Sequence, residues 1–530
     1  MTRRFVSYGP VDNNLHFYAP RKALIHEAYL HLLGEHPDSS GHYVTVWAPR
    51  QTGKSWIMQQ ILFLLRQDDR FDVLKLNLEN LKDQTDPKKV LSHISQRIGD
   101  GLGLSFPEVD TQSKFQDIFK RGILDKPLIL ILDEFDALSN RAIDAVVSTL
   151  RNIYITRLDE MDKPPEQKSF LLHGLALVGI RSVLGIDSDK GSPFNVQRGL
   201  HIPNLNFEEV LGMFQWYERE SGQSIEVDVV EKVFNETNGQ PGLTCWFGEL
   251  LTDKYNDQKD RPITLEKFEH IREAAVNVLP NSNILNIIHK ADVEPHRNVV
   301  LDMFKTDELS RFKFDDKSDN YLYMNGVIEP VEMDGKFVVR FANPFVQKRL
   351  FNYFSNELFK DMGQLVEPMD DLADAFSEEG LNVSKVMERY QRYLDRNRHW
   401  LFKDAPRRKD LRLYEAVFHF NIYMFLFNLV ERHGGRVFPE FPTGNGKIDI
   451  IIKYKEKTYG IELKSFAASS AYTSSLKQSA HYGNRLGLKE IHLALFIESI
   501  DEENRRKYEA PYTDEESGVK VLPMFIQTGE

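Results

Sequence analysis

A short run of residues near the N-terminus has the composition of a phosphate-binding loop. It follows an apolar stretch, Tyr43–Trp47, whose pattern predicts a buried strand, and it ends in Gly53, Lys54 and Ser55. A loop that ends this way and opens a helix surrounds a nucleotide β-phosphate with backbone N–H groups. Its lysine reaches the β- and γ-phosphates, and its serine hydroxyl binds Mg²⁺. Ala48 stands where such a tight loop prefers glycine, and its small side chain is expected to fit. The residues expected to contact the nucleotide are Pro49, Arg50, Gln51, Thr52, Gly53, Lys54, Ser55 and Trp56.

A second apolar run, residues 127–134, ends in two adjacent carboxylates. Asp133 is expected to hold Mg²⁺ through water, and Glu134 is placed to orient and polarise the water that attacks the γ-phosphate. Asp136 follows as either a substitute for Glu134 or a cap of the next helix. A strand end that is acidic without a catalytic role is the competing interpretation. Together the two motifs predict ATP hydrolysis with Mg²⁺.

Two arginines downstream are candidates for sensing the γ-phosphate. Arg181 and Ser182 follow a fourth apolar strand, and strand carboxyl ends in nucleotide-binding α/β folds face the ligand. Arg198 is placed as an arginine finger, acting either in its own chain or in a neighbouring subunit of a homo-oligomer. For each arginine, a surface salt bridge is an equally good interpretation.

A second group of polar residues lies near the C-terminus, in two β-rich stretches. The polar residues 455–457 predict a hairpin turn, and a two-residue turn places Asp449 directly opposite Glu462. Strand alternation then puts Lys464 on the same face as Glu462. The two carboxylates and the Leu463 carbonyl offer hard oxygen ligands for Mg²⁺ or Mn²⁺. Lys464 would stabilise a metal-activated hydroxide and the charge that develops on a phosphodiester.

Three further residues strengthen this motif. Glu415 precedes it in an amphipathic stretch, residues 411–432, and Gln478 and Tyr482 follow it four residues apart, on one face of a predicted helix. The competing interpretations are an exposed strand beside an ordinary helix face, and a site that has lost its activity.

The elements that position the first group alternate between strand and helix over residues 43–205. This rhythm predicts a parallel sheet with helices on both faces. The expected strands are residues 44–47, 71–76, 128–132 and 170–178, and the expected helices are residues 56–65, 90–101, 114–119 and 143–158.

The whole chain divides by pattern into five parts. We expect an ATPase core over residues 1–205, a helical lid over 206–280, a winged-helix-like domain over 285–360, a helical connector over 361–404 and a last domain over 405–530. In the third part, residues 321–329 and 336–341 predict a hairpin with its turn at 333–335, followed by a helix over 344–354.

Composition limits the classes of protein that remain. A chain of 530 residues is expected to hold three or four domains. The net charge of −12 argues against a protein that coats nucleic acid nonspecifically. Cys245 is the only cysteine, which fits a reducing cytoplasm, and neither a signal peptide nor a membrane span is expected.

The N-terminal motifs resemble those of AAA-like and STAND-like prokaryotic ATPases. The resemblance rests on four segments, residues 49–55, 132–138, 192–195 and 238–243, and it covers residues 15–355. It implies that a helical lid and a winged-helix domain follow the ATPase core, and that residues 239–241 close near the nucleotide.

The C-terminal motif resembles the PD-(D/E)xK nuclease superfamily over residues 405–500, although Ile448 replaces the proline of the pattern. The resemblance implies an α/β restriction-endonuclease-like domain in which Asp449 and Glu462 bind metal and Lys464 assists the nucleophile. Glu415 would hold metal through water, and Gln478 and Tyr482 would position the site or the DNA backbone.

The sequence therefore predicts a cytoplasmic prokaryotic ATPase fused to a metal-dependent DNA nuclease, and the resemblance implies a role in defence or mobile-element biology. The alternative is an ATP-dependent switch whose nuclease fold is inactive and binds DNA or a protein partner.

Overall fold

The structure is a computed structural model that describes residues 3–34, 41–179, 197–304, 310–407, 413–441, 449–466 and 469–529. Arg181 and Ser182 lie outside these residues. The chain forms two compact units, Met1–Glu273 with Tyr323–Gly326, and Ala274–Leu322 with Val327–Glu530. Each unit is described by itself.

The first unit is built on a five-stranded sheet with the order β2-β3-β4-β1-β5, in which every pair of neighbours is parallel. Its central strands are continuous apolar runs, as expected for a parallel sheet that is buried on both faces. The four expected strands are confirmed, and the edge strand β5 was not predicted. The strands are β1 (Tyr43–Trp47), β2 (Asp72–Asn77), β3 (Leu128–Asp133), β4 (Leu172–Gly179) and β5 (Gln197–His201).

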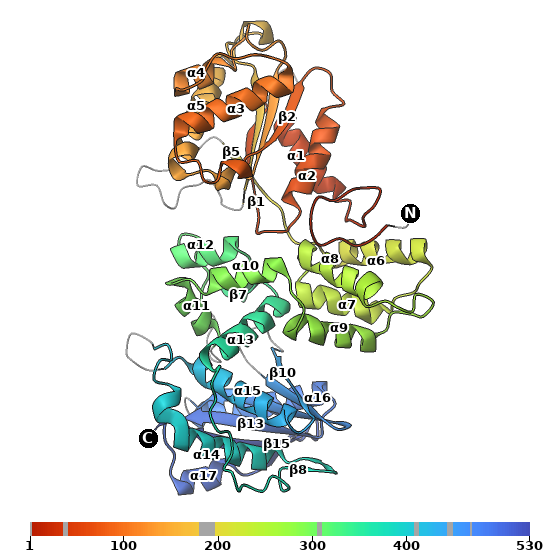
Figure 1. The fold of residues 1–530 in the computed structure, drawn as a ribbon, viewed down its shortest axis with the longest axis vertical. Coiled ribbons are helices and arrows are strands. Elements are labelled where there is room, and N and C mark those ends of the chain that lie inside the picture. The colour runs from red at the N-terminus through yellow and green to blue at the C-terminus, as the bar shows by residue number, and fades with distance from the viewer. Residues whose placement is uncertain are drawn as a thin grey trace. The chain divides into compact units, whose positions relative to one another are not determined.

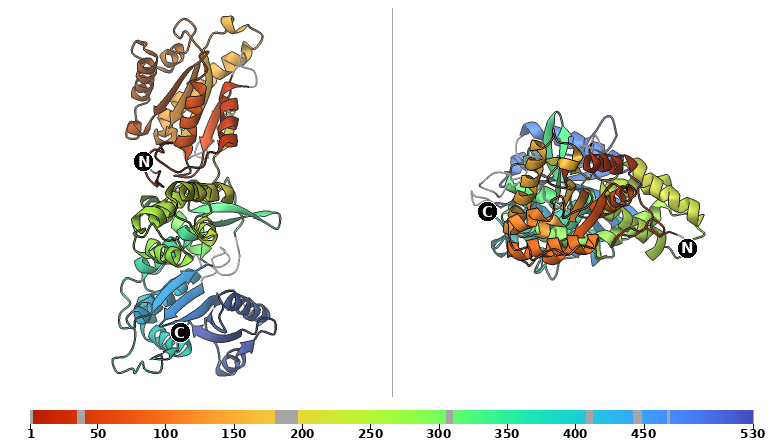
Figure 2. Two further views of the ribbon diagram at one scale, coloured as in Figure 1. Left: turned by 90° about the vertical axis from the view of Figure 1, so that its right-hand side faces the viewer. Right: turned by 90° about the horizontal axis from the view of Figure 1, so that it is seen from above.

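Helices cover both faces of this sheet (Figures 1 and 2). Helices α1 and α2 share one apolar core with the sheet, and α3, α4 and α5 share another on the opposite face. The expected α/β architecture is therefore confirmed for this part of the chain. These helices are α1 (Lys22–Leu33), α2 (Lys54–Leu65), α3 (Pro87–Leu102), α4 (Gln112–Asp117) and α5 (Asn140–Asp159), and short 3₁₀ turns cover Glu79–Leu81, Phe135–Ala137 and Pro165–Gln167.

A helical part follows the sheet, as predicted. Its first helix begins with a reciprocal cap, in which the side chains of Asn206 and Glu209 each accept a backbone N–H of the other residue. The N-terminal lead packs against this helix through Phe5, whose ring lies 4.9 Å from that of Phe214. The helices are α6 (Phe207–Ser221), α7 (Val227–Thr237), α8 (Pro241–Glu249), which continues as a π-helical turn over Leu250–Lys254, and α9 (Leu265–Asn277).

The second unit begins with helices and a hairpin. The hairpin pairs β6 (Ile328–Met333) with β7 (Lys336–Phe341) in antiparallel register, and Figure 2 shows it projecting from its neighbours. The expected hairpin is confirmed, but its first strand begins at Ile328, because residues 321–324 belong to a helix and not to the strand. The helices are α10 (Ser282–Ala291), α11 (His296–Met303), α12 (Lys317–Met324) and α13 (Pro344–Leu358).

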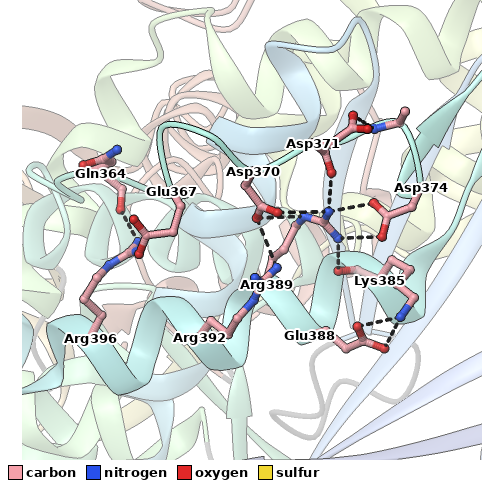
Figure 3. Close-up of polar contacts among 11 residues, drawn as sticks. Gln364, Glu367, Asp370, Asp371, Asp374, Lys385, Glu388, Arg389, Arg392 and Arg396 are labelled. Atoms are coloured by element: carbon pink, nitrogen blue, oxygen red, sulfur yellow. Dashed lines mark hydrogen bonds and ion pairs between the residues drawn. The ribbon is translucent and has the colours of Figure 1, made fainter.

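The connector is less helical than predicted. In residues 361–404, all of which the structure describes, the one helix is α14 (Val383–Leu401), and it follows a loop and a two-stranded hairpin, β8 (Phe376–Ser377) with β9 (Gly380–Leu381). The loop is held by the buried Arg389, whose guanidinium pairs with Asp370 at 3.2 Å and with Asp374 at 2.6 Å (Figure 3). These arginine hydrogen bonds order the loop that carries the acidic residues, so the loop is held in place without forming a helix.

A six-stranded sheet with the order β10-β11-β12-β13-β15-β14 forms the C-terminal part. Strands β10 to β12 are antiparallel, and β12, β13 and β15 are parallel. Helix α15 is apolar on nearly every side because the fold buries it almost completely. The elements are α15 (Glu415–Glu431), β10 (Arg436–Glu440), β11 (Asp449–Tyr454), β12 (Lys457–Ser465), α16 (Ser469–Arg485), β13 (Glu490–Ile497), α17 (Glu502–Tyr508), β14 (Tyr512–Thr513) and β15 (Lys520–Gln527).

Within the described ranges, every helix is too short or too polar to traverse a lipid bilayer.

Candidate functional site

The phosphate loop lies between the carboxyl end of β1 and the start of α2, as predicted. Gly53 caps the helix with φ of 91°, a left-handed conformation that glycine adopts without a steric penalty. Thr52 closes the loop by donating its hydroxyl to the Pro49 carbonyl at 2.9 Å. Ala48 is fully buried, so its methyl group fits where glycine is usual. Gln51 also has a positive φ, and Arg50 is exposed.

Lys54 is buried under this loop. Its Nζ donates to the carbonyl oxygens of Ala48 at 2.8 Å and Pro49 at 2.7 Å. Burial lowers the pKa of Lys54 to about 8, although Glu134, Asp136 and Asp133 favour its charged form. The ammonium therefore sits in a poorly solvated, acid-lined site, where an additional anion would stabilise its charge.

The two carboxylates at the end of β3 face the loop. Ser55 Oγ lies 3.5 Å from Asp133 Oδ1, which brings together the two residues predicted to hold Mg²⁺. The backbone N–H of Glu134 donates to the same oxygen at 3.2 Å. Burial, followed by the nearby Asp136 and Asp133, raises the pKa of the Glu134 carboxyl. A carboxylate with a raised pKa and a position beside the loop suits a group that accepts a hydrogen bond from water.

Lys75 is a member of this site that the sequence analysis missed. It lies on β2, and its Nζ contacts Asp133 Oδ2 at 2.9 Å. The two oxygens of Asp133 thus have separate partners, with Oδ1 toward Ser55 and Oδ2 held by Lys75. A single lysine within the apolar run of β2 was the available signal, because a lysine at such a position is expected to be paired.

The loop between α7 and α8 reaches the phosphate loop, as the resemblance implied. Gln240 donates its side-chain amide to the Arg50 carbonyl at 3.1 Å, and the Gly242 N–H donates to the Gln51 carbonyl at 3.1 Å. Gly239 has φ of 64°, and a Cβ there would lie 1.9 Å from the Leu205 carbonyl. The fold therefore requires glycine at this position.

Aromatic side chains lie at the first turns of α2. Trp56 donates its indole N–H to Asn13 Oδ1 at 3.2 Å, and its ring lies 5.1 Å from that of Tyr18. Tyr18 also contacts Trp216 of α6. The N-terminal lead thus links the helix that follows the phosphate loop to the helical part of the unit.

Arg198 is not brought to the phosphate loop of its own chain. On β5 it pairs with Val44, near the start of β1, whereas the loop follows the end of β1. Its guanidinium faces His31 of α1, with 3.4 Å between Nη1 and Nδ1. Action in a neighbouring subunit stays a prediction for Arg198, and the prediction for Arg181 falls outside the described residues.

The C-terminal carboxylates have the predicted register. Asp449 on β11 lies directly opposite Glu462 on β12, and the hairpin turn is the two residues Lys455 and Glu456. Both carboxylates are buried. Leu463 points to the other face of the sheet and is fully buried there.

Lys464 links this pair to helix α16. Its Nζ lies 2.8 Å from Glu462 Oε1 and donates to Gln478 Oε1, also at 2.8 Å. Tyr482 follows one turn after Gln478. Burial raises the pKa of Tyr482 well above its usual value, and Asp449, then Glu440 and Glu462, add to the shift. The predicted residues of β11, β12 and α16 therefore converge.

Glu415 lies on α15, the helix that precedes the sheet. It is the first residue of α15, and its carboxylate faces His419 of the same helix, with 3.7 Å between Oε1 and Nε2. Its contact with a metal ion through water stays a prediction.

One further observation indicates that Asp449 and Glu462 suit a divalent cation. Within the described part of the chain, Glu462 Oε2 is buried without a hydrogen-bond partner. A buried carboxylate oxygen of this kind is costly unless a cation or water satisfies it. The described residues hold no group of three or more His, Cys, Asp or Glu side chains placed around one ion. Any ion here would therefore rest on Asp449, Glu462, the Leu463 carbonyl and water.

One protein family matches part of the first unit. Residues 6–253 match the family described as AAA-like domain. None of the curated proteins compared with the chain matches it.

Three solved structures are similar to this chain. The Walker-type ATPase PABY2304 of Pyrococcus abyssi is 13% identical, with a TM-score of 0.42, and the match covers 65% of this chain and 99% of that one. The Aeropyrum pernix ORC1 protein in complex with DNA is 14% identical, with a TM-score of 0.33, over 63% of this chain and 92% of that one. The RuvB Holliday junction branch migration motor of Thermotoga maritima is 16% identical, with a TM-score of 0.33, over 60% and 92%.

Proposed function

We propose that the chain binds and hydrolyses ATP with Mg²⁺ at the phosphate loop of its AAA-like domain, and that its C-terminal sheet cuts DNA with a divalent metal ion. The first part is supported by Lys54 beneath the loop and by Ser55 beside Asp133. The second part rests on one observation, the register that places Asp449 opposite Glu462 with Lys464 beside them.

At the phosphate loop each residue has a separate role. Lys54 neutralises the β- and γ-phosphates, and Ser55 and Asp133 hold Mg²⁺. Glu134 orients the attacking water and accepts a hydrogen bond from it. Gln240 and Gly242 hold the carbonyls of Arg50 and Gln51, which keeps the loop in shape while its N–H groups face the phosphates.

At the C-terminal site the residues divide between binding and charge stabilisation. A divalent ion, when bound, supplies Lewis acidity and lowers the pKa of water. Asp449 and Glu462 would hold it, together with the Leu463 carbonyl. Lys464 places its ammonium where negative charge develops on the phosphodiester, and Gln478 fixes its position. Tyr482 remains a neutral hydrogen-bond donor in this acidic setting.

A cleavage assay on the full chain tests the proposal. Linear, supercoiled and single-stranded DNA are incubated with Mg²⁺ or Mn²⁺, in the presence of ATP, a non-hydrolysable analogue or no nucleotide. Asp449→Ala, Glu462→Ala and Lys464→Ala should each lower the cutting rate by about 10²-fold or more, because each removes a metal ligand or a stabilising charge. ATP hydrolysis should stay near the wild-type rate.

Glu490→Gln is the matched control, since Glu490 is a half-exposed carboxylate on β13 of the same sheet. It should cut as the wild type does. If the wild type cuts no DNA under any of these conditions, or Asp449→Ala cuts normally, the C-terminal sheet is a binding module. The chain then acts as an ATP-dependent switch for DNA or a protein partner.

A further inference from the structure

A third carboxylate extends the row formed by Asp449 and Glu462. Glu440 is the last residue of β10 and lies directly opposite Asp449 on β11. Residues directly opposite one another in antiparallel strands have their side chains on the same face, about 5 Å apart. Glu440, Asp449 and Glu462 therefore line one face of three neighbouring strands.

A buried lysine from outside the sheet meets the end of this row. Lys348, on α13, places its Nζ 3.2 Å from Glu440 Oε2, and the side chains are 5% and 26% exposed. At the other end Lys464 contacts Glu462 at 2.8 Å. A row of three carboxylates thus has a lysine at each end. One of the two, Lys348, lies more than 80 residues before the first strand of the sheet.

Burial distinguishes this ion pair from an ordinary surface contact. Lys520 and Glu490 on β15 and β13 also lie 3.2 Å apart, but their side chains are 46% and 44% exposed. A surface pair of that kind contributes little to stability. Removing a lysine from water is costly, so its position at the carboxylate row calls for a compensating charge.

We propose that Glu440 and Lys348 are positioning residues that set the charge of the C-terminal metal site, Glu440 strengthening and Lys348 weakening its hold on a divalent cation. The inference rests on the proposed function. Glu440 acts through its charge and not as a third ligand, because the described residues place no three acidic side chains around one ion.

The direction of each effect follows from Coulomb's law. A carboxylate next to the pair attracts a cation, and an ammonium next to that carboxylate offsets the attraction. Among the described residues, the groups that face Glu440 include Lys348 from α13, Asp449 from β11 and Tyr482 from α16. Helix α13 therefore controls the charge of a site that the sheet and α16 otherwise build.

Calorimetric titration of the full chain with Mn²⁺, without DNA, measures these effects. Glu440→Gln should weaken binding of Mn²⁺ roughly tenfold, and Lys348→Met should strengthen it by a similar factor. The double variant should return close to the wild-type affinity. Lys348→Arg keeps the charge and should bind as the wild type does. Glu490→Gln and Lys520→Met serve as the matched pair and should change nothing.

The outcomes separate this inference from the proposed function. If the wild type binds no Mn²⁺ at the sheet, as judged by Asp449→Ala, the proposed DNA cleavage fails and the inference falls with it. If the wild type binds Mn²⁺ and cuts DNA, but Glu440→Gln keeps full affinity, only the inference is overturned. Shifts of the same sign in both variants would indicate a merely structural role. Should Lys348→Met not fold, the loss in Glu440→Gln, with Glu490→Gln as its control, decides the matter alone.

Discussion

Lys75 on β2 holds one carboxylate oxygen of Asp133 on β3, with 2.9 Å between Nζ and Oδ2. Asp133 is 2% exposed, so this ion pair lies in the interior beside the phosphate loop. It leaves the other oxygen of Asp133 directed at Ser55. The sheet thus fixes the orientation of a predicted magnesium ligand through a residue on the neighbouring strand.

The ion pair predicts a specific pattern of stability. Lys75→Met should lower the free energy of unfolding by about 3 kcal/mol, because it leaves the buried charge of Asp133 uncompensated. Asp133→Asn should destabilise the chain in the same way. The double variant should recover much of the loss, since neither charge remains. Thermal unfolding of the four proteins gives the coupling between the two residues. Additive losses would show that the pair does not interact.

Glu134→Gln should separate nucleotide binding from hydrolysis. The amide keeps the shape of the side chain but no longer carries the charge that orients the attacking water, so turnover should fall by about 10²-fold or more. Titration with a non-hydrolysable analogue should show nearly unchanged affinity. Lys54→Ala is the contrasting variant and should lose binding as well, because it removes the ammonium beneath the loop. Normal turnover in Glu134→Gln would move the role to Asp136.

How far the sequence predicts these sites depends on how local their signals are. The loop between β1 and α2 and the hairpin of β11 and β12 lie where the sequence predicts them, because a loop–helix junction and a two-residue turn are set by adjacent residues. Glu440 and Lys348 leave no such signal. Residues 441–448 separate Glu440 from its strand partner, and α13 lies far upstream in the chain. Packing between distant elements creates these contacts.

The loop before α14 also depends on contacts that its local sequence does not predict. The sequence predicts a helical connector here, yet the structure forms a loop whose acidic residues bind arginines of α14 (Figure 3). Ion pairs between these carboxylates and the arginines hold the loop in place, where a helix would be held by backbone hydrogen bonds. Local propensity was overridden here by one buried guanidinium, Arg389.

Arg389→Met should therefore destabilise the second unit far more than Arg392→Met. Arg389 is buried and contacts Asp370, Asp374 and the Asp371 carbonyl, so its loss should cost about 3 kcal/mol or more. The Arg392 side chain is 56% exposed, and in this loop its ion pair is with Asp370. Its loss should therefore lower the free energy of unfolding by at most about 1 kcal/mol. Thermal unfolding and proteolysis within residues 361–380 compare the two variants. Equal effects would mean that burial does not distinguish the two arginines.

The first unit should become less stable as the pH decreases, because His173 is buried in its neutral form. This residue is buried on β4, donates its Nε2 proton to the Leu33 carbonyl at 2.8 Å and packs on Phe71. Burial lowers the pKa of His173 from 6.5 to about 4. Between these values the unfolded chain binds a proton that the folded chain does not. The stabilising contribution of neutral His173 is thus complete above pH 6.5 and is lost as pH falls toward 4.

The full loss is on the order of 3 kcal/mol. Thermal unfolding of the wild type and of His173→Gln at pH 7.5, 6.5, 5.5 and 4.5 measures it. Glutamine retains a side-chain N–H donor and does not titrate, so the variant should lose less stability than the wild type over this range. His399→Gln is the control, because His399 is an exposed residue of the second unit. Parallel pH profiles for the wild type and His173→Gln would show that His173 does not bind the proton on unfolding.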